Sequence, residues 1–179
     1  GMPYAFFVKT RDVDGGEYGN LILSKYPISD GVNYDLPRIE TVEDVYPRSM
    51  GVVKTEKEGK SFYFGVTHLS HVGNETNRIN QTTTIIEKTK GLDKPMILTG
   101  DFNALADSGP MKILYERFEI GCLNGNYGLT TGTPVPVKAI DFVLYTPDEG
   151  MSPKAYDVHY DAYVESDHFP VVATFSIND

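Results

Sequence analysis

The feature that most constrains the fold is an apolar strand that ends abruptly in polar side chains. In PMILTGDFNA, residues 95–104, an apolar run leads within a few residues to Asp101 and Asn103. One interpretation is that the strand stops in an Asx turn, where a short polar side chain bonds the backbone that follows. The other is that the strand end is a rigid platform that presents both polar groups to a ligand. Both interpretations stay open for this segment alone.

Short strand-like segments recur along the chain and are bounded by turn residues. In KSFYFGVTHL, residues 60–69, Phe62, Phe64 and Val66 alternate with Ser61, Tyr63 and Gly65, which is the period of a half-buried strand, and His68 follows at its end,. Further segments with strand character cover residues 4–9, 20–23, 50–55, 139–145, 155–160 and 170–177.

Two segments have the signals of helices. Residues 74–90 begin with Asn74, which can cap a helix, and end before Gly91, which favours termination,. A shorter helix is predicted after Pro110, to about residue 117,. Because strands and helices alternate only in part, the pattern predicts an α/β (α+β) layered domain. One face of the first helix is predicted to comprise Ile79, Thr83, Ile86 and Lys90.

Composition limits the class of protein. With 179 residues, of which 40% are hydrophobic, the chain is predicted to form a single domain over residues 1–179,. A formal charge of −9 argues against a protein whose whole surface binds nucleic acid,. The single cysteine, Cys122, excludes an internal disulfide and any multi-cysteine metal site,. A local basic patch stays open for Arg11, Lys25, Arg38, Arg48, Lys54 and Arg78.

No transmembrane segment is predicted, because no apolar run approaches the ~20 residues that a spanning helix needs,. The chain also lacks a basic and then apolar signal segment at its start,. We therefore expect a soluble chain. Its localisation is left open, since any export signal would precede this chain.

Polar residues adjoin apolar strands at other places besides the GDFNA segment. Asp141 lies between Ile140 and Phe142, where a lone carboxylate is costly to bury without a partner,. His168 would suit as that partner, because an aspartate bonded to one imidazole nitrogen fixes the tautomer and leaves the other nitrogen for a ligand. His68 has a simpler alternative, since a hydrogen-bonded structural histidine also fits a strand end.

In their order along the chain, these segments resemble the endonuclease/exonuclease/phosphatase superfamily, the deoxyribonuclease-I-like metal-dependent phosphoesterases. The motifs are GGEYGNLILSKYPI, GVTHLSH, NRINQ, PMILTGDFNA, AIDFVLY and SDHFPVVATF, and they cover nearly the whole chain. The resemblance implies a four-layer αββα sandwich of two packed mixed sheets between helices, with the active site at one sheet edge. It also implies that activated water hydrolyses a phosphoester.

Carried over by motif, the resemblance implies five catalytic residues. His68 would bind the phosphate, Asp101 would orient or deprotonate the attacking water, and Asn103 would hold the nucleophile or a phosphoryl oxygen. Asp141 would orient His168, which would stabilise the pentacovalent phosphorus. The chemistry needs such groups, because an in-line water requires a proton acceptor and the equatorial oxygens gain charge. Asp101 and His168 are both open as the general base.

The resemblance also implies a divalent cation, usually Mg²⁺, with Mn²⁺ or Ca²⁺ as alternatives. Its ligands would be Asp167, Asp101 and Asn103. Oxygen ligands suit Mg²⁺, which keeps several waters and needs only one or two protein carboxylates. Three substrate classes stay open: a small molecule, a lipid head group and nucleic acid.

The sequence departs from the family pattern at its start. Family members begin with a strand that ends in asparagine and a second strand that ends in a metal-binding glutamate, whereas the match here starts around residues 5–22 and Glu17 falls in a turn. We therefore expect the N-terminal strands and helix of the domain to be missing, with weakened metal binding. An exposed sheet edge would then favour a homo-oligomer that covers it.

Two classes of function follow from these expectations. The first is a metal-dependent phosphodiesterase, nuclease or phosphatase. The second is a non-catalytic phosphate- or partner-binding module that retains the same fold. An ester hydrolase with a serine nucleophile is disfavoured, because no GxSxG segment precedes the histidine,.

Overall fold

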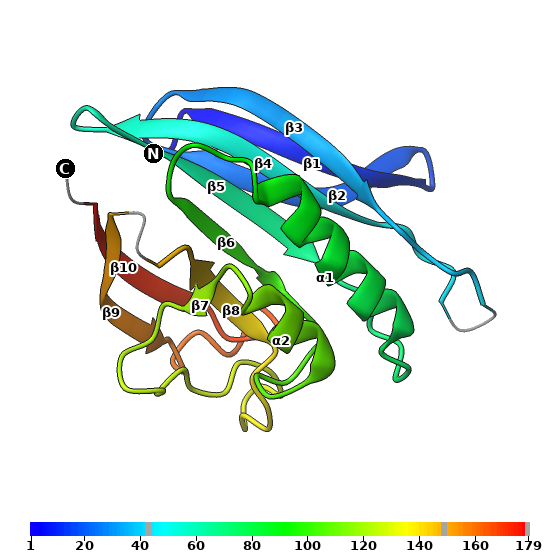
Figure 1. Ribbon diagram of the computed structural model, residues 1–179. Helices are drawn as coiled ribbons and strands as arrows, with labels where there is room; N and C mark the ends of the chain where they lie inside the picture. Colours follow the sequence, from blue (N-terminus) through cyan, green and yellow to red (C-terminus); the bar gives the residue numbers. More distant parts are fainter. Residues whose placement is uncertain (42–43, 148–149, 178–179) are drawn as a thin grey trace.

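A mixed sheet of six strands forms the centre of the fold (Figure 1). The computed structural model describes residues 1–41, 44–147 and 150–177. The β5–β6 pair of the sheet is parallel, and its other pairs are antiparallel. In spatial order the strands are β3 (Ile28–Leu36), β4 (Arg48–Lys57), β5 (Lys60–His68), β6 (Met96–Asp101), β8 (Asp141–Tyr145) and β7 (Glu119–Ile120).

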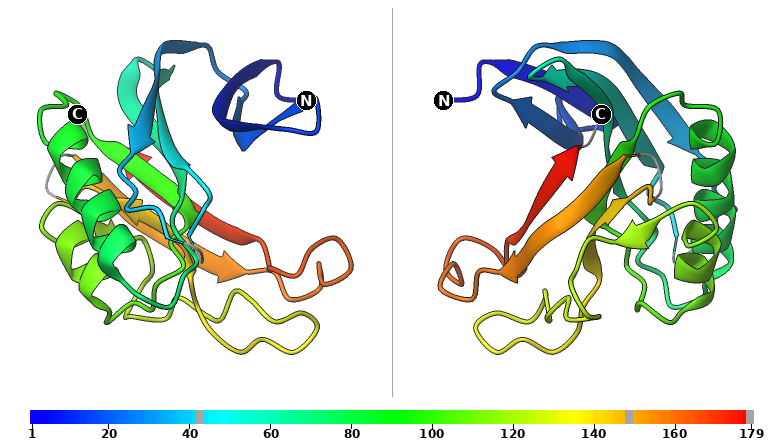
Figure 2. Two further views of the ribbon diagram at one scale, coloured as in Figure 1. Left: turned by 90° about the vertical axis from the view of Figure 1, so that its right-hand side faces the viewer. Right: turned by 60° about the vertical axis from the view of Figure 1, so that its left-hand side comes forward.

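Two antiparallel hairpins lie on one face of this sheet, and two helices lie on the other (Figures 1 and 2). The first hairpin contacts β3, β4 and β5, and the second contacts β8. The α/β (α+β) sandwich class is thereby confirmed, and a fourth, helical layer is not among the described residues. The hairpins are β1 (Tyr4–Val13) with β2 (Gly16–Ser24) and β9 (Met151–Val158) with β10 (Val171–Ile177); the helices are α1 (Thr76–Thr89) and α2 (Gly109–Leu114).

The main hydrophobic core fills the space between the central sheet and the helices. Its largest fully buried side chains are aromatic: Phe102, Phe118 and Phe142. Phe102 directly follows β6, so the residue between Asp101 and Asn103 anchors this strand end in the core. The Asx turn of the GDFNA segment is present, because Oδ1 of Asp101 accepts the backbone N–H of Asn103,. The buried packing of Phe102 also makes the strand end rigid, as the platform interpretation requires, so the two interpretations do not exclude each other,.

The register of the sheet places three polar residues in a row. His68 at the end of β5 is opposite Asp101 at the end of β6, and Asp101 is opposite Asp141 at the start of β8. Directly opposed residues have Cβ atoms about 4.5–5.5 Å apart. Three segments distant in the chain thus bring their polar ends to one edge of the sheet.

The predicted strands are found with shifted ends: β1, β2 and β4 are longer than expected, and β9 covers Met151–Val158 instead of 155–160. The sequence pattern did not predict β3 and β7. β3 is interrupted by a register shift between Ser29 and Val32, and Asp30 in this segment has a φ of 52°. Such an irregularity hides the period-two alternation by which a strand is recognised. β7 has only two residues, which is too short for any pattern.

The face of α1 that is buried is not the one formed by Ile79, Thr83, Ile86 and Lys90, although Ile86 is partly buried against the core. Ile79 is exposed. The buried face is displaced by about one residue from the predicted one and comprises Asn77, Arg78, Gln81, Thr82, Ile85 and Thr89. This face is polar because its side chains bond the chain around them. Gln81 accepts from the backbone N–H of Ser70 and donates to the carbonyl of Pro37. A hydrophobic period cannot identify a face that is held by hydrogen bonds.

No helix in the described ranges is long and apolar enough to cross a membrane. The extent of the domain over residues 1–179 stays a prediction.

Candidate active site

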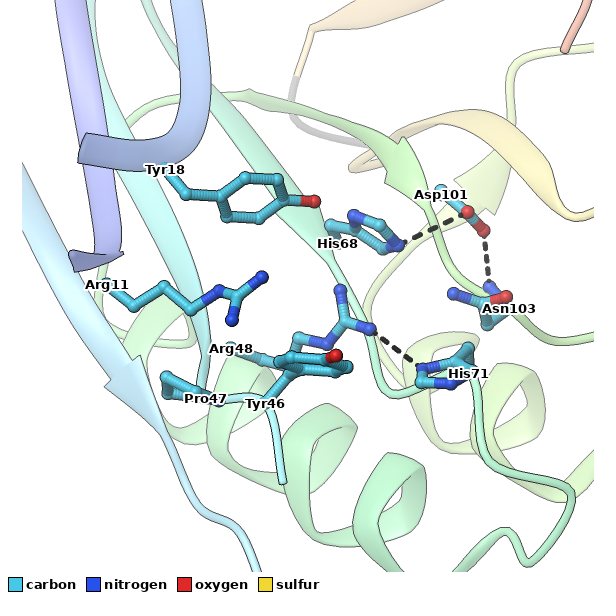
Figure 3. Close-up of a pocket in the computed structure, with 9 residues that line it drawn as sticks. All are labelled: Arg11, Tyr18, Tyr46, Pro47, Arg48, His68, His71, Asp101 and Asn103. Atoms are coloured by element: carbon cyan, nitrogen blue, oxygen red, sulfur yellow. Dashed lines mark hydrogen bonds and ion pairs between the residues drawn. The ribbon is translucent and has the colours of Figure 1, made fainter. Parts of the chain in front are cut away.

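A cavity of about 420 Å³ opens at the edge of the sheet where β5 and β6 end (Figure 3). The hairpin β1–β2 forms one side of it, and the ends of β5 and β6 form the other. The residues that line it are Arg11, Tyr18, Tyr46, Pro47, Arg48, His68, His71, Asp101 and Asn103. Three of the predicted catalytic residues, His68, Asp101 and Asn103, therefore share one cavity.

Asp101 is held at the centre of the site. Its Oδ1 accepts the backbone N–H of Asn103 at 2.8 Å, and its Oδ2 lies 3.4 Å from Nε2 of His68. Burial and, after it, the negative charge of Asp141 raise the pKa of Asp101 from 3.8 to about 6. A carboxylate with this pKa is a stronger proton acceptor than an ordinary aspartate and is still ionised at neutral pH.

His68 is neutral at neutral pH. Burial and, after it, the charges of Arg48, His168 and His71 lower its pKa to about 4. The contact between His68 and Asp101 at 3.4 Å is therefore not an ion pair in this range, although its distance alone would allow one. A neutral imidazole can serve as a hydrogen-bond donor without repelling a cation nearby.

Asn103 owes its position to the backbone. Its φ of 48° lies in the left-handed region, which asparagine tolerates better than most residues,. Its side-chain Nδ2 donates to the carbonyl of Leu69 at 3.0 Å. The amide nitrogen is committed to this bond, so Oδ1 is the atom that Asn103 can offer to a cation.

A second pair lies next to the cavity. Nδ1 of His168 is 2.8 Å from Oδ2 of Asp141, as the sequence predicts. The same carboxylate oxygen accepts the hydroxyl of Thr130 at 2.6 Å. Thr130 is fully buried, and its hydroxyl also accepts the backbone N–H groups of Ile140 and Asp141. Asp141 therefore has the hydrogen-bond partners that a partly buried carboxylate needs, and several hydrogen bonds fix its orientation,.

Sequence reasoning missed Thr130. It lies in an irregular segment that reaches the site through isolated bridges from Thr131 to Lys138 and to His168. No local pattern marks such a residue, because only the path of the loop brings it to Asp141.

The two pairs meet in a cluster suited to a cation. One ligand atom each of Asp101, Asp141 and His168 lies within 4.8 Å of the others. Carboxylate oxygens are the ligands that Mg²⁺ prefers. Burial is the main cause of the raised pKa of Asp101, and the negative charge of Asp141, which a cation would compensate, is the second. Asp167 is exposed and is not a member of this cluster, so its assignment as a metal ligand stays a prediction.

The opposite side of the cavity is cationic. Arg48 is only 6% exposed and donates to Nδ1 of His71 at 3.2 Å. The guanidinium carbon of Arg11 lies 4.2 Å from the centre of the Tyr46 ring and 5.0 Å from that of Tyr18. The sequence left a local basic patch open, and the fold brings together Arg11 and Arg48.

Arg78 has a structural role instead. It is buried on α1 and donates to the backbone carbonyls of Ser70, Val72 and Gly73. It thus braces the loop that carries His71 and does not line the cavity.

Fold and site together define a layered α+β domain with carboxylate–histidine pairs and arginines at one sheet edge. A family model described as the endonuclease/exonuclease/phosphatase family matches residues 2–168. The chain belongs to this family, whose very name describes enzymes that cleave phosphoesters. No curated protein matches the chain.

Solved structures share the fold at low sequence identity. The endonuclease/exonuclease/phosphatase from Bacteroides vulgatus is 23% identical with a TM-score of 0.81, over 98% of this chain and 76% of that one. A mannosyl-6-phosphatase from Bacteroides thetaiotaomicron is 21% identical with a TM-score of 0.80, over 98% and 78%. D. rerio TDP2, complexed with a single-strand DNA product, is 16% identical with a TM-score of 0.72, over 97% and 76%.

Proposed function

We propose that this chain hydrolyses a phosphoester through attack by water, with a divalent cation. The observation that carries the proposal is the register of β5, β6 and β8, which sets His68, Asp101 and Asp141 in one row. His168 joins this row through its bond to Asp141. The family membership supports the same chemistry.

In this proposal Asp101 is the general base. Its pKa of about 6 lies near neutrality, where a base combines ionisation with useful proton affinity,. The hydrogen bond from the N–H of Asn103 fixes one carboxylate oxygen and leaves Oδ2 toward His68 to take the proton of water. His168 could act as a base only through Nε2, and the proposal assigns this nitrogen to the phosphoryl oxygens instead.

The remaining groups bind the phosphoryl oxygens. His68 offers a ring N–H, and His168 offers Nε2–H in its imidazolium form, since Asp141 binds only Nδ1,. Donors held in place before the reaction stabilise the negative charge that grows on these oxygens.

The cation would be held by Asp101, which belongs to the cluster with Asp141 and His168, and by Oδ1 of Asn103, with Asp167 as a further predicted ligand. The oxygen donors fit Mg²⁺, and Mn²⁺ and Ca²⁺ are the alternatives. When bound, the cation supplies positive charge at the phosphoryl group.

A chromogenic diester tests the proposal. With bis(p-nitrophenyl) phosphate and Mg²⁺ or Mn²⁺, we expect release of p-nitrophenolate that stops when EDTA is added. The His168→Ala variant should lose this activity, and the variant Lys138→Ala, which changes an exposed residue, should keep it. Binding of phosphate without turnover under any of these cations would instead support the non-catalytic phosphate- or partner-binding module.

The substrate class is part of the proposal. The sandwich fold is shared with a mannosyl-6-phosphatase and with a protein complexed with a DNA product, so fold similarity leaves the small-molecule, lipid head-group and nucleic-acid classes open. We favour a small phosphorylated molecule, because the formal charge of −9 disfavours long nucleic acids and the cavity of about 420 Å³ suits a compact ligand,.

We also propose self-association through the first hairpin. Leu21 and Leu23 project from the same face of β2 and are both about half exposed, beside the partly exposed Phe7 of β1. Apolar clusters on a hairpin edge favour pairing with another chain. We expect light scattering after size-exclusion chromatography to give a dimer for the unaltered chain and a monomer for Leu21→Lys/Leu23→Lys. The control Val135→Lys, at another exposed apolar position, should stay dimeric; a monomeric unaltered chain would contradict this proposal.

A further inference from the structure

We propose that Arg11 and Arg48 bind a second phosphoryl group of the substrate, beside the one that is cleaved. The inference rests on the proposed function and names its substrate class: a small phosphoester that carries another phosphate close to the scissile one. Arg11 is then a specificity residue, and Arg48 lies between both groups.

The two arginines are cations without anionic partners. Both have a buried Nε with no hydrogen-bond partner. Only 6% of the Arg48 surface is exposed. Within the described part of the chain, neither is ion-paired with a carboxylate. Burial lowers the pKa of Arg48 most, and the charge of Arg11 also lowers it, against the opposite effect of Tyr18, Asp44 and Asp101. Two like charges brought together in one cavity cost free energy that a bound anion would recover.

A bulge in β1 aims Arg11 into the cavity. The register between β1 and β2 shifts between Lys9 and Arg11, and Arg11 becomes the direct partner of Tyr18. Lys9 instead forms ion pairs with Asp12 and Glu17, which are exposed. A bulge changes the direction of the side chains beside it, so these two basic residues of one strand separate.

The hairpin is tied to the sheet at the same point. The hydroxyls of Thr10 and Ser49 are hydrogen bonded at 2.6 Å, and these residues adjoin Arg11 and Arg48 in the chain. The rings of Tyr46 and Tyr18 then hold the Arg11 guanidinium at 4.2 and 5.0 Å. A guanidinium held on aromatic faces keeps its N–H groups at the edge for bidentate bonds to phosphate.

The positions of these groups separate two subsites. Figure 3 shows Arg48 between Arg11 and the Asp101–His68 pair, with both guanidinium groups directed into the cavity. The pKa of Arg48 responds to both neighbours, since the charge of Asp101 raises it and that of Arg11 lowers it. A cavity of about 420 Å³ is large enough for a small molecule and not only for a single phosphate,. A substrate cleaved beside Asp101 therefore needs a second anionic group to reach Arg11.

Binding of inorganic anions tests this subsite without turnover. By calorimetry in EDTA, pyrophosphate should bind the unaltered chain at least about 10-fold more tightly than orthophosphate, as charged hydrogen bonds of ~1.5 kcal/mol or more predict. Arg11→Gln should remove this difference. The matched control Lys9→Ala takes a positive charge from the same strand and should preserve it. Arg11→Lys, which keeps the charge but not the planar fork, should recover only part of it.

The outcomes separate the subsite from the proposed function. Equal affinities for both anions in the unaltered chain, or a pyrophosphate affinity that survives Arg11→Gln, would overturn the subsite whether or not bis(p-nitrophenyl) phosphate is hydrolysed. Where that diester is hydrolysed, Lys9→Ala should change its kcat/KM by less than about 3-fold, because Lys9 does not line the cavity. Thermal unfolding of each variant checks that the fold is kept, and Arg11→Lys serves in place of Arg11→Gln if the latter unfolds.

Discussion

Replacement of Asp101 by asparagine is expected to stabilise the fold at neutral pH while it abolishes hydrolysis. The pKa of Asp101 rises from 3.8 to about 6 on folding, because burial and the charge of Asp141 disfavour the ionised form. This difference in the pKa of Asp101 between the unfolded and the folded chain destabilises the fold by at most about 3 kcal/mol at neutral pH. Asparagine has no charge to bury, and its Oδ1 can still accept the N–H of Asn103. A general base is lost, so kcat/KM should fall by about 10²–10⁴-fold.

The effect of Asp101→Asn on the free energy of unfolding depends on pH. Because the folded-state pKa is raised, the favourable contribution of Asp101 is fully present below pH 3.8 and is lost as the pH rises through about 6,. The stability gain of Asp101→Asn should therefore be small near pH 4 and grow toward pH 7, by about 1–3 kcal/mol in denaturant-induced unfolding without metal. The control Asp107→Asn changes an exposed carboxylate and should show no such trend. A loss of stability at both pH values would contradict the prediction.

Replacement of Asp141 by asparagine is expected to lower kcat by about 10³–10⁴-fold, the size of effect that follows when an aspartate that orients a catalytic imidazole loses its charge. Oδ2 of Asp141 receives both the Thr130 hydroxyl and the His168 ring nitrogen. An asparagine in this place can present either oxygen or nitrogen to His168. Oxygen keeps Nδ1 protonated but lacks the negative charge that stabilises the imidazolium, and nitrogen selects the tautomer with an unprotonated Nδ1. Nitrogen NMR of the His168 ring measures the tautomer, and steady-state kinetics measures kcat.

A matched change at Thr130 separates orientation from packing. Thr130→Ser keeps the hydroxyl that bonds Asp141 and should keep kcat within about 10-fold, since one well-placed hydrogen bond is preserved,. If Asp141→Asn leaves both the tautomer and kcat unchanged, Asp141 does not orient His168 in the reaction.

Some of the residues predicted to be catalytic have a local signal in the sequence. An apolar strand that ends in Asp101 and Asn103, and a carboxylate at residue 141 between apolar neighbours, mark positions where burial conflicts with charge,. The pairing of Asp141 with His168 followed from this conflict, and the structure confirms it at 2.8 Å. The first helix shows the limit of such reasoning, because its buried face is held by Arg78 and Gln81 through hydrogen bonds and carries no hydrophobic period.

Local chemistry along the chain thus specified which side chains need partners and where strands end. Only the tertiary structure decided which side chains lie next to one another. The register that opposes His68, Asp101 and Asp141 joins residues up to 73 positions apart, from 68 to 141. The bulge that turns Arg11 toward Arg48, and the loop that carries Thr130 to Asp141, likewise depend on long-range pairing. Contacts of this kind are selected by packing of the whole sheet, and no period within a short window records them.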